Sequence, residues 1–140
     1  MYKTEQLINP TADDIAQILN LFRNINGRTC TAADYLKYLN VNWGNIALFI
    51  AKDEAGNIVS FTQAESPSIL DPKCAWLPFS YSDSKFGHKR ALEAVKMAEN
   101  WMRERGATKW KMNTVLSPSA INRLWGLKQS DEIIMEKIIQ

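Results

Sequence analysis

Two apolar runs near the middle of the chain, in IALFIAKDEAGNIVSFTQAES, constrain the fold more than any other feature. The first run, Ile46 to Ala51, is almost wholly apolar, which is typical of a strand in the centre of its sheet. Between the runs, residues 53–57 have the composition of a turn, with Gly56 available for its left-handed position. The stretch therefore predicts a β-hairpin whose first strand is central.

Helix-start signals occur twice before this hairpin. Thr11 can cap a helix, with Asp14 as the reciprocal acid three residues later, and Thr31 and Asp34 repeat the arrangement. Apolar residues follow the first cap at helical spacing, namely Ile15, Ile18, Leu19 and Phe22. We therefore expect two helices here, preceded by a first strand within residues 2–8.

Two further strands and a long helix are predicted after the hairpin. Residues 74–81, CAWLPFSY, indicate a strand in which Pro78 cannot donate to the ladder, so we expect a bulge or a break there. Residues 88–105 carry apolar side chains on one helical face and charged ones on the other, and Gly106 suits the position just past the helix. Residues 109–115, KWKMNTV, alternate as the next strand.

The C-terminal part of the chain completes the pattern. Residues 117–125 predict a short helix with Ser117 as its cap and Pro118 at its first position, and residues 132–139, EIIMEKII, predict a final strand. The whole order is β, α, α, a hairpin, β, α, β, α, β. It predicts one domain over residues 1–140 with an α/β fold, an α+β sandwich in which helices flank a mixed, mostly antiparallel sheet.

Charge and cysteine content argue against several classes of protein. Lys and Arg number 17 against 15 Asp and Glu, so the net charge of +2 lacks the basic footprint of a nucleic-acid binder. No signal peptide is apparent, and no run reaches the roughly eighteen apolar residues of a membrane span. Cys30 and Cys74 lie far apart without the spacing of a metal or redox site. We therefore expect a cytoplasmic protein without a metal or a membrane partner.

The start of the long helix, together with the order of elements, resembles the GNAT superfamily of N-acetyltransferases, which take an acetyl group from acetyl-CoA. The family's pyrophosphate loop is usually written (Gln/Arg)-x-x-Gly-x-(Gly/Ala), and FGHKRA falls on it, counting back from WMRERGA. Ala91 fits the last position of this pattern, and Gly87 fits an extra glycine that many members carry. Two positions depart from the pattern: Phe86 replaces the Arg or Gln, and Lys89 replaces the central glycine. Further on, SPSAI and GL look like the family's NPAAI and GF.

The loop chemistry is consistent with a phosphate ligand. A helix N-terminus offers unpaired N–H groups and partial positive charge, and glycine lets the backbone approach phosphate oxygens. The alternative is an ordinary solvated helix start, although clustered basic residues there oppose the helix dipole unless an anion is bound. With the resemblance, acetyl-CoA is the expected co-substrate, bound by Phe86, Gly87, His88, Lys89, Arg90, Ala91 and Ser117.

The resemblance also implies where the rest of the co-substrate lies. Backbone groups of Phe79, Ser80 and Tyr81 would pair with the pantetheine arm, where strand 74–81 separates from strand 109–115. Trp43 and Trp76 could line the pocket for the acceptor, or simply pack.

Catalytic candidates are few. A glutamate on this strand is common in the family, but strand 74–81 has no carboxylate. Glu65 on the preceding strand is therefore the expected base, and Asp71 in the loop is an alternative. Either of them could instead be a solvated surface residue. Tyr81 could donate a hydrogen bond near the thioester or only pack. No tyrosine follows Tyr81, whereas many members protonate the leaving thiolate with one before GF.

These features predict an acetyl-CoA-dependent N-acetyltransferase acting on a primary amine of a small molecule or peptide. The alternative is a GNAT-fold protein, of the kind encoded by phages and mobile elements, that has lost catalysis and serves a binding or structural role. The replaced loop glycine, the missing tyrosine and the missing strand glutamate favour that alternative. A homodimer is a further expectation.

Overall fold

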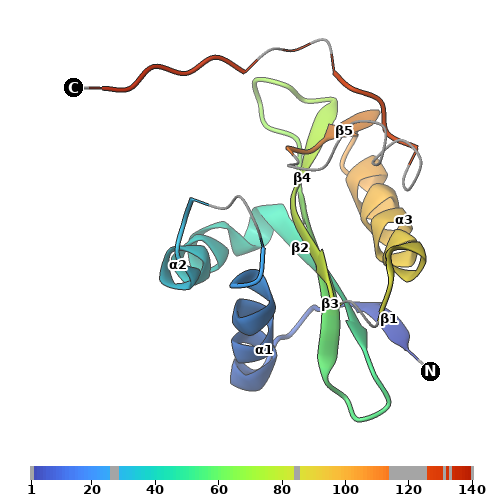
Figure 1. Cartoon of the computed structure of the whole chain (residues 1–140). Helices are drawn as coiled ribbons and strands as arrows, with labels where there is room; N and C mark the ends of the chain where they lie inside the picture. Colours follow the sequence, from blue (N-terminus) through green and yellow to red (C-terminus); the bar gives the residue numbers. More distant parts are fainter. Residues whose placement is uncertain are drawn as a thin grey trace.

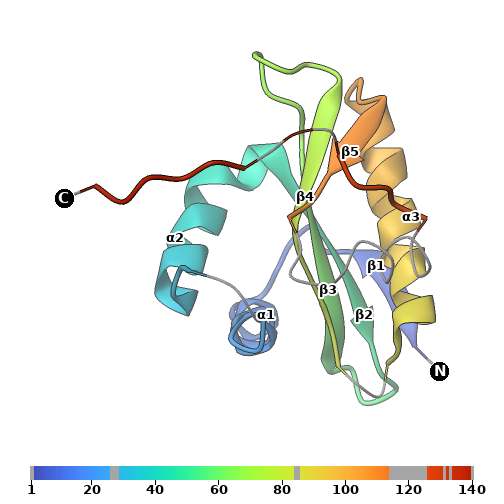
Figure 2. The ribbon, with the colours of Figure 1, turned by 45° about the horizontal axis from the view of Figure 1, so that its top comes forward.

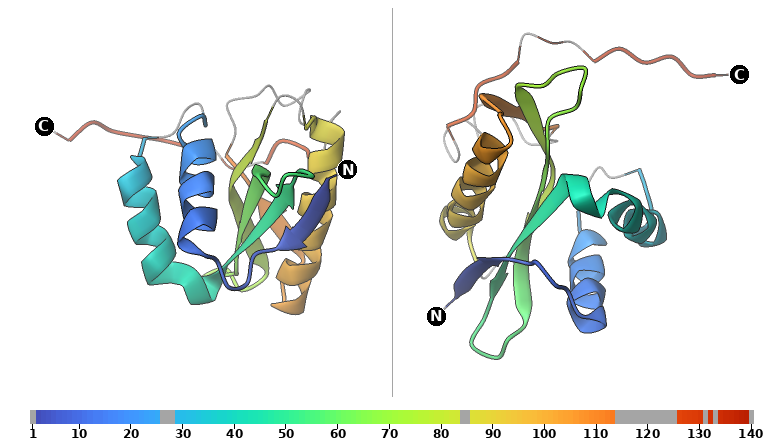
Figure 3. Two further views of the ribbon diagram at one scale, coloured as in Figure 1. Left: turned by 90° about the horizontal axis from the view of Figure 1, so that it is seen from below. Right: turned by 180° about the vertical axis from the view of Figure 1, so that it is seen from behind.

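The computed structural model describes residues 2–25, 29–83, 86–113, 126–130, 132 and 134–139, with only the backbone of residues 88 and 89. A five-stranded sheet, in the order β1-β2-β3-β4-β5, lies between α1 and α2 on one face and α3 on the other (Figures 1 and 3). The elements are β1 (Lys3–Gln6), α1 (Ala12–Phe22), α2 (Ala32–Asn42), the 3-10 turn η1 (Trp43–Asn45), β2 (Ile46–Lys52), β3 (Ile58–Glu65), β4 (Cys74–Ser82), α3 (His88–Glu104) and β5 (Lys109–Lys111).

The pairing of the strands confirms a mixed, mostly antiparallel sheet. β1 to β4 pair as antiparallel neighbours, and β5 joins β4 in parallel after the crossover through α3. β2 lies between β1 and β3, and its residues Ile46 to Ala51 are all buried, as its apolar run predicts. Gly56 has φ +83° in the turn between β2 and β3, so the predicted hairpin is confirmed.

Both helices before the hairpin begin with the predicted capping boxes. The N–H of Asp14 donates to the Thr11 hydroxyl at 3.1 Å, and the N–H of Thr11 donates to the Asp14 carboxylate at 2.9 Å. Thr31 and Asp34 form the same reciprocal pair. Each cap satisfies otherwise unpaired backbone donors and contributes about 1 kcal/mol to helix stability.

Two apolar layers hold the helices to the sheet. On the α1 and α2 side, the ring of Phe22 stacks on Tyr35 with centroids 4.1 Å apart, and Phe79 meets both rings edge-on. On the α3 side, a second cluster joins the helix to strands β2, β3 and β4. Its buried members are Ala47, Phe49, Ala64, Ala75, Leu77, Ala94, Val95, Ala98, Trp101 and Met102.

A bulge interrupts β4 at the predicted position. Gln63 of β3 is opposite Phe79, and Glu65 is opposite Trp76, so two steps along β3 correspond to three along β4. Pro78 lies within this extra length. The bulge changes which face the side chains occupy: Leu77 packs on the α3 side, whereas Phe79 packs on the α1 and α2 side.

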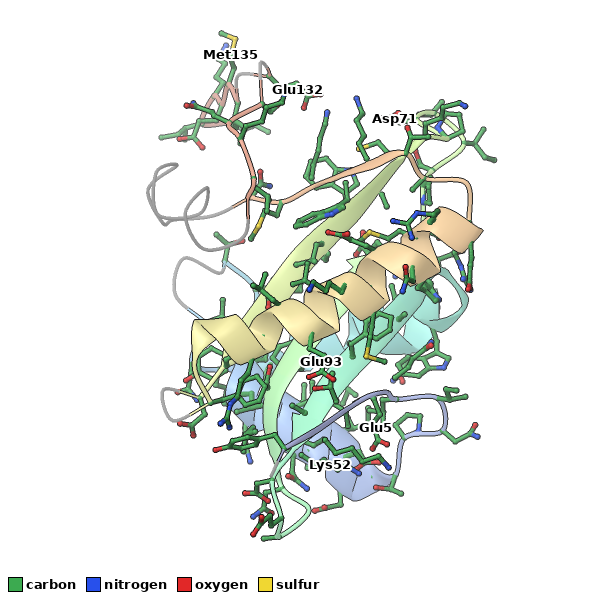
Figure 4. The ribbon with its side chains drawn as sticks, turned by 90° about the vertical axis from the view of Figure 1, so that its right-hand side faces the viewer. Glu5, Lys52, Asp71, Glu93, Glu132 and Met135 are labelled. Carbon is green, nitrogen blue, oxygen red and sulfur yellow. The ribbon has the colours of Figure 1, made fainter. Side chains whose placement is uncertain are left out.

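The C-terminal prediction differs from the structure. The predicted strand over residues 132–139 is wrong for the residues that are described there, because none is in a strand. Its apolar residues are adjacent rather than alternating, and this pattern suits a strand that is covered on both faces. Among the described residues, no strand lies beside the segment to pair with it. The segment projects from the body (Figures 1 and 2), and Figure 4 shows Met135 away from the sheet.

Other expectations for this half of the chain are met in part or cannot be compared. β5 ends at Lys111, although the sequence predicts a strand to residue 115, and residues 114–125, which include the predicted short helix, are outside the described residues. Within the described ranges, no helix is both long and apolar enough to cross a membrane.

Candidate active site

The edge of β4 beyond the bulge is open on the side of β5. β5 pairs with β4 only from Cys74 to Trp76, and in the described part of the chain no strand pairs with this edge from Leu77 to Ser82. The backbone N–H and C=O groups along this edge are therefore available to a ligand that carries amide groups of its own. The structure places Phe79, Ser80 and Tyr81 on this open edge.

The side chains of these three residues already have contacts within the protein. Phe79 packs edge-on against Phe22 and Tyr35, with ring centroids 5.1 and 5.3 Å away. The Ser80 hydroxyl lies 3.0 Å from that of Thr62 on β3. Tyr81 is half-buried and packs against the core on the α1 and α2 side. What this stretch offers a ligand is mainly its backbone.

The open edge leads to the N-terminus of α3. Gly87 is the residue before the helix, with φ +82° and ψ +151°, a conformation that is close to exclusive to glycine. Gly87, the N-cap residue, has no side chain that could cap the helix, and the first turn of α3 holds no acidic residue of its own. An anion fits the partial positive charge at this point.

Phe86 and Ala91, two of the predicted loop residues, anchor this helix start in the core. Phe86 is 4% exposed and packs in a small cluster with Ala51 and Ala91, while the ring of Tyr2 meets it edge-on at 5.0 Å. An aromatic ring replaces the Arg or Gln of the GNAT pattern because this position faces apolar neighbours. The side chain of Phe86 is therefore not presented to a ligand in this structure.

Arg90 is exposed but turned toward β1, the edge of the sheet farthest from β5. Its guanidinium carbon lies 4.6 Å from the centre of the Tyr2 ring, a cation–π contact. A shallow hollow of about 270 Å³ is lined there by Tyr2, Thr4, Phe86, Arg90 and Glu93. Figure 4 shows Glu93 on the side of α3 that faces β1 and Glu5. His88 and Lys89 contribute first-turn backbone, and Ser117 lies outside the described residues.

Glu65 belongs to a polar network on the α1 and α2 side of the sheet. The Tyr35 hydroxyl donates to the carboxamide oxygen of Gln63 at 2.5 Å, and Nε2 of Gln63 donates to Oε1 of Glu65 at 3.2 Å. The Tyr38 hydroxyl donates to the same carboxylate oxygen. Gln63 is fully buried and Glu65 is half-buried. Glu65 is thus neither a plain solvated carboxylate nor an unsatisfied one.

Both tyrosines of this network are donors at ordinary pH. Burial, and next the charge of Glu65, raise the pKa of Tyr35. Burial, and next the hydrogen bond to Glu65, raise the pKa of Tyr38. Their hydroxyls therefore keep their protons and can donate to Gln63 and to Glu65. The second carboxylate oxygen of Glu65, Oε2, accepts no hydrogen bond from any described residue.

The network lies level with the point where β4 and β5 separate. Glu65 is opposite Trp76 across β3 and β4, and Trp76 pairs with Lys111 of β5 in the last paired position of those two strands. Asp71, the alternative base, is exposed in the loop between β3 and β4, where its backbone pairs with Ser68 and accepts from the Cys74 N–H. Glu65 is therefore a half-buried carboxylate close to the separation point, where Lys111 also pairs with the exposed carboxylate of Glu132.

Sequence reasoning finds Glu65 but misses its partners. Tyr35 and Tyr38 lie three apart on one face of a capped helix, and Gln63 and Glu65 lie two apart on one face of a largely buried strand. A polar residue in a buried strand requires a partner, which is the signal that could have drawn attention to Gln63. The spacing does not identify which helix supplies that partner.

Comparisons with known proteins agree on the architecture. No protein-family model and no curated protein sequence matches the chain. Among solved structures, AAC(6')-Iy in complex with the bisubstrate analogue CoA-S-monomethyl-acetylneamine is similar with a TM-score of 0.75 and 13% identity, over 100% of this chain and 99% of that one. The glucosamine-6-phosphate N-acetyltransferase of Arabidopsis thaliana has a TM-score of 0.67 and 14% identity, over 100% and 99%.

A Trypanosoma brucei acetyltransferase is also similar, with a TM-score of 0.72 and 12% identity over 99% of this chain and 100% of that one. At these identities the likeness defines the fold. The chain has the GNAT acetyltransferase fold, which confirms the α+β architecture expected from its sequence.

Proposed function

We propose that the protein is an acetyl-CoA-dependent N-acetyltransferase that acetylates a primary amine of a small molecule or a peptide. The observation that carries this proposal is the edge of β4 that no described strand covers. This edge runs from the separation of β4 and β5, near Glu65, to the start of α3 at Gly87. Similar solved structures include N-acetyltransferases and a complex with a CoA-containing analogue, which supports this choice of co-substrate.

The described residues fit acetyl-CoA as a co-substrate. The backbone of Phe79, Ser80 and Tyr81 would pair with the amides of the pantetheine arm, because no strand in the described part of the chain pairs with this edge. The first N–H groups of α3, after Gly87, would bind the diphosphate. Lys89 would add a positive charge, whereas Arg90 would first have to leave the ring of Tyr2.

The reaction needs a neutral amine next to the thioester. Glu65 would take one proton from the acceptor's ammonium, directly or through water, and the freed lone pair would attack the acetyl carbonyl. The new C–N bond replaces the C–S bond, so one ammonium and one acetyl-CoA give one N-acetyl amine, one CoA thiol and one released proton. Orientation of the two bound reactants would lower the activation barrier by several kcal/mol. Tyr81 would donate a hydrogen bond near the thioester.

The second candidate function is a binding or structural role without catalysis. The sequence supports it, because β4 carries no carboxylate and no tyrosine follows Tyr81 to protonate the thiolate. Leu124 and Trp125, which stand where that tyrosine would be, are outside the described residues. Binding of acetyl-CoA without any product would favour this second function.

Product formation tests the proposed function. With acetyl-CoA and a suitable primary amine, we expect free CoA thiol and N-acetyl amine to form in equal amounts. Thiol without acetylated amine would mean hydrolysis of the thioester, and neither product across a broad panel of amines would contradict the proposal.

We also propose that two copies associate through the C-terminal segment of residues 134–139. Four large apolar side chains there are 80–95% exposed, namely Ile134, Met135, Ile138 and Ile139. Such a run in an extended segment favours burial against its own copy in a two-fold arrangement.

Light scattering during gel filtration tests this association. We expect a dimer for the wild type and a monomer for the double variant Ile134→Asp, Ile138→Asp. Ile69→Asp is the matched control, because Ile69 is 96% exposed in the loop between β3 and β4. A wild type that stays monomeric at high concentration would contradict the proposal.

A cytoplasmic location is a further proposal, supported by two cysteines that do not form a disulfide with each other. Cys30 is half-buried and Cys74 is buried, and burial raises the pKa of the Cys74 thiol, which keeps it unreactive. Either cysteine found in a disulfide in protein isolated from its host would contradict this location.

A further inference from the structure

We propose that Tyr38 of α2 is a positioning residue for acetyl transfer: its hydroxyl holds one oxygen of Glu65, so that the other oxygen meets the ammonium of the acceptor. The inference rests on the proposed function, because Glu65 acts as a base only if transfer takes place beside it.

Two donors fix the same carboxylate oxygen. Oε1 of Glu65 accepts from the Tyr38 hydroxyl and from Nε2 of Gln63, the latter at 3.2 Å. These donors come from different elements, α2 and β3, so they restrict both the rotation and the tilt of the carboxylate. Oε2, which has no donor among the described residues, is left for a ligand.

The Gln63 side of this arrangement is rigid. Its carboxamide oxygen accepts from the Tyr35 hydroxyl at 2.5 Å, which turns its amide nitrogen toward Glu65. The ring of Tyr35 is in turn stacked on Phe22, with an angle of 2° between the planes. Tyr38 is only half-buried, so it supplies the outer of the two donors.

The charge around Glu65 favours a cationic acceptor. Its partners are neutral donors, and within the described ranges no Lys or Arg forms an ion pair with it. The titratable groups near the network are Tyr35 and Tyr38 of α2 and Cys30 just before that helix. A half-buried carboxylate with neutral partners attracts a cation, and the ammonium of a primary amine supplies one.

The variant Tyr38→Phe tests the positioning role, because it keeps the ring and removes the donor. We expect kcat for acetyl transfer to fall about tenfold or more, the effect of one hydrogen bond to a charged group. The KM for acetyl-CoA should not change, because Tyr38 lies away from α3. Gln17→Met is the matched control: it removes a 2.8 Å bond from the Ile58 N–H at the other end of β3 and should keep the wild-type kcat.

A double-mutant cycle separates positioning from a general loss of structure. In the Glu65→Gln background, Tyr38→Phe should have no further effect on kcat, because the residue that it positions is no longer a base. Equal effects in both backgrounds, or an unchanged kcat in the single variant, would overturn the inference.

A readout that needs no activity completes the test. Ultraviolet titration of the folded protein should show Tyr38 ionising at lower pH in Glu65→Gln than in the wild type, because the carboxylate no longer disfavours the phenolate. Unchanged ionisation would overturn the contact itself. A wild type that acetylates no amine would overturn the proposed function and the positioning role with it, whereas an active wild type with an unaffected Tyr38→Phe would overturn the positioning role alone.

Discussion

We expect replacement of Glu65 by glutamine to lower kcat for acetyl transfer by about 10²-fold or more, the usual contribution of a general base. Glutamine has almost the same shape, and its carbonyl oxygen can still accept from Tyr38 and Gln63, so the network survives. Only the ability to take a proton is lost. Steady-state kinetics with thiol detection measures kcat, and thermal unfolding shows whether stability is unchanged.

Asp71→Asn is the matched control for this variant. Asp71 is the other carboxylate near the separation of β4 and β5, but it is exposed in the loop and is outside the network of Glu65. We expect Asp71→Asn to keep the wild-type kcat. A large loss in Asp71→Asn with none in Glu65→Gln would assign the base to the loop.

Replacing Gly87 by alanine removes the stabilisation of the protein by acetyl-CoA. A residue with a Cβ disfavours φ +82° and ψ +151° by about 1–3 kcal/mol, so the start of α3 has to adopt a different backbone. The first N–H groups of the helix then no longer point together at a diphosphate. If the wild type binds as proposed, acetyl-CoA at about 100 times its Kd should stabilise it by about 2.7 kcal/mol, measured as a higher melting temperature.

Gly56→Ala separates backbone strain from ligand binding. Gly56 also has a positive φ, +83°, and no atom lies within 4 Å of the position of an added Cβ at either glycine. Both variants should melt below the wild type, but Gly56→Ala should keep its full response to acetyl-CoA. An unimpaired response in Gly87→Ala would remove this loop from the binding site.

Local signals in the sequence were sufficient for most of the fold. The capping boxes at Thr11 and Thr31 depend on residues three positions apart, and the hairpin depends on Gly56 between two apolar runs. Pro78 locates the bulge because a missing donor disturbs a ladder in any context. Each feature is determined within a short stretch of chain, which explains why it could be predicted.

The parts that could not be predicted depend on distant partners. Tyr35 and Gln63 lie 28 positions apart, and their hydrogen bond exists only because α2 packs on β3. The same holds for Arg90, whose basic side chain is turned to Tyr2 at the far edge of the sheet. The segment 132–139 has apolar residues but, in the described part of the chain, no neighbouring strand to complete its pairing.

Detection of the acetylated amine by mass spectrometry tests the central claim most directly. The full-length protein is incubated with acetyl-CoA and a panel of small-molecule and peptide amines, with Glu65→Gln in parallel. We expect one acetyl group on a primary nitrogen, matched by one CoA thiol, at a rate about 10²-fold or more above that of the variant. A raised melting temperature with acetyl-CoA but no acetylated product from any amine would contradict catalysis and identify a binding protein.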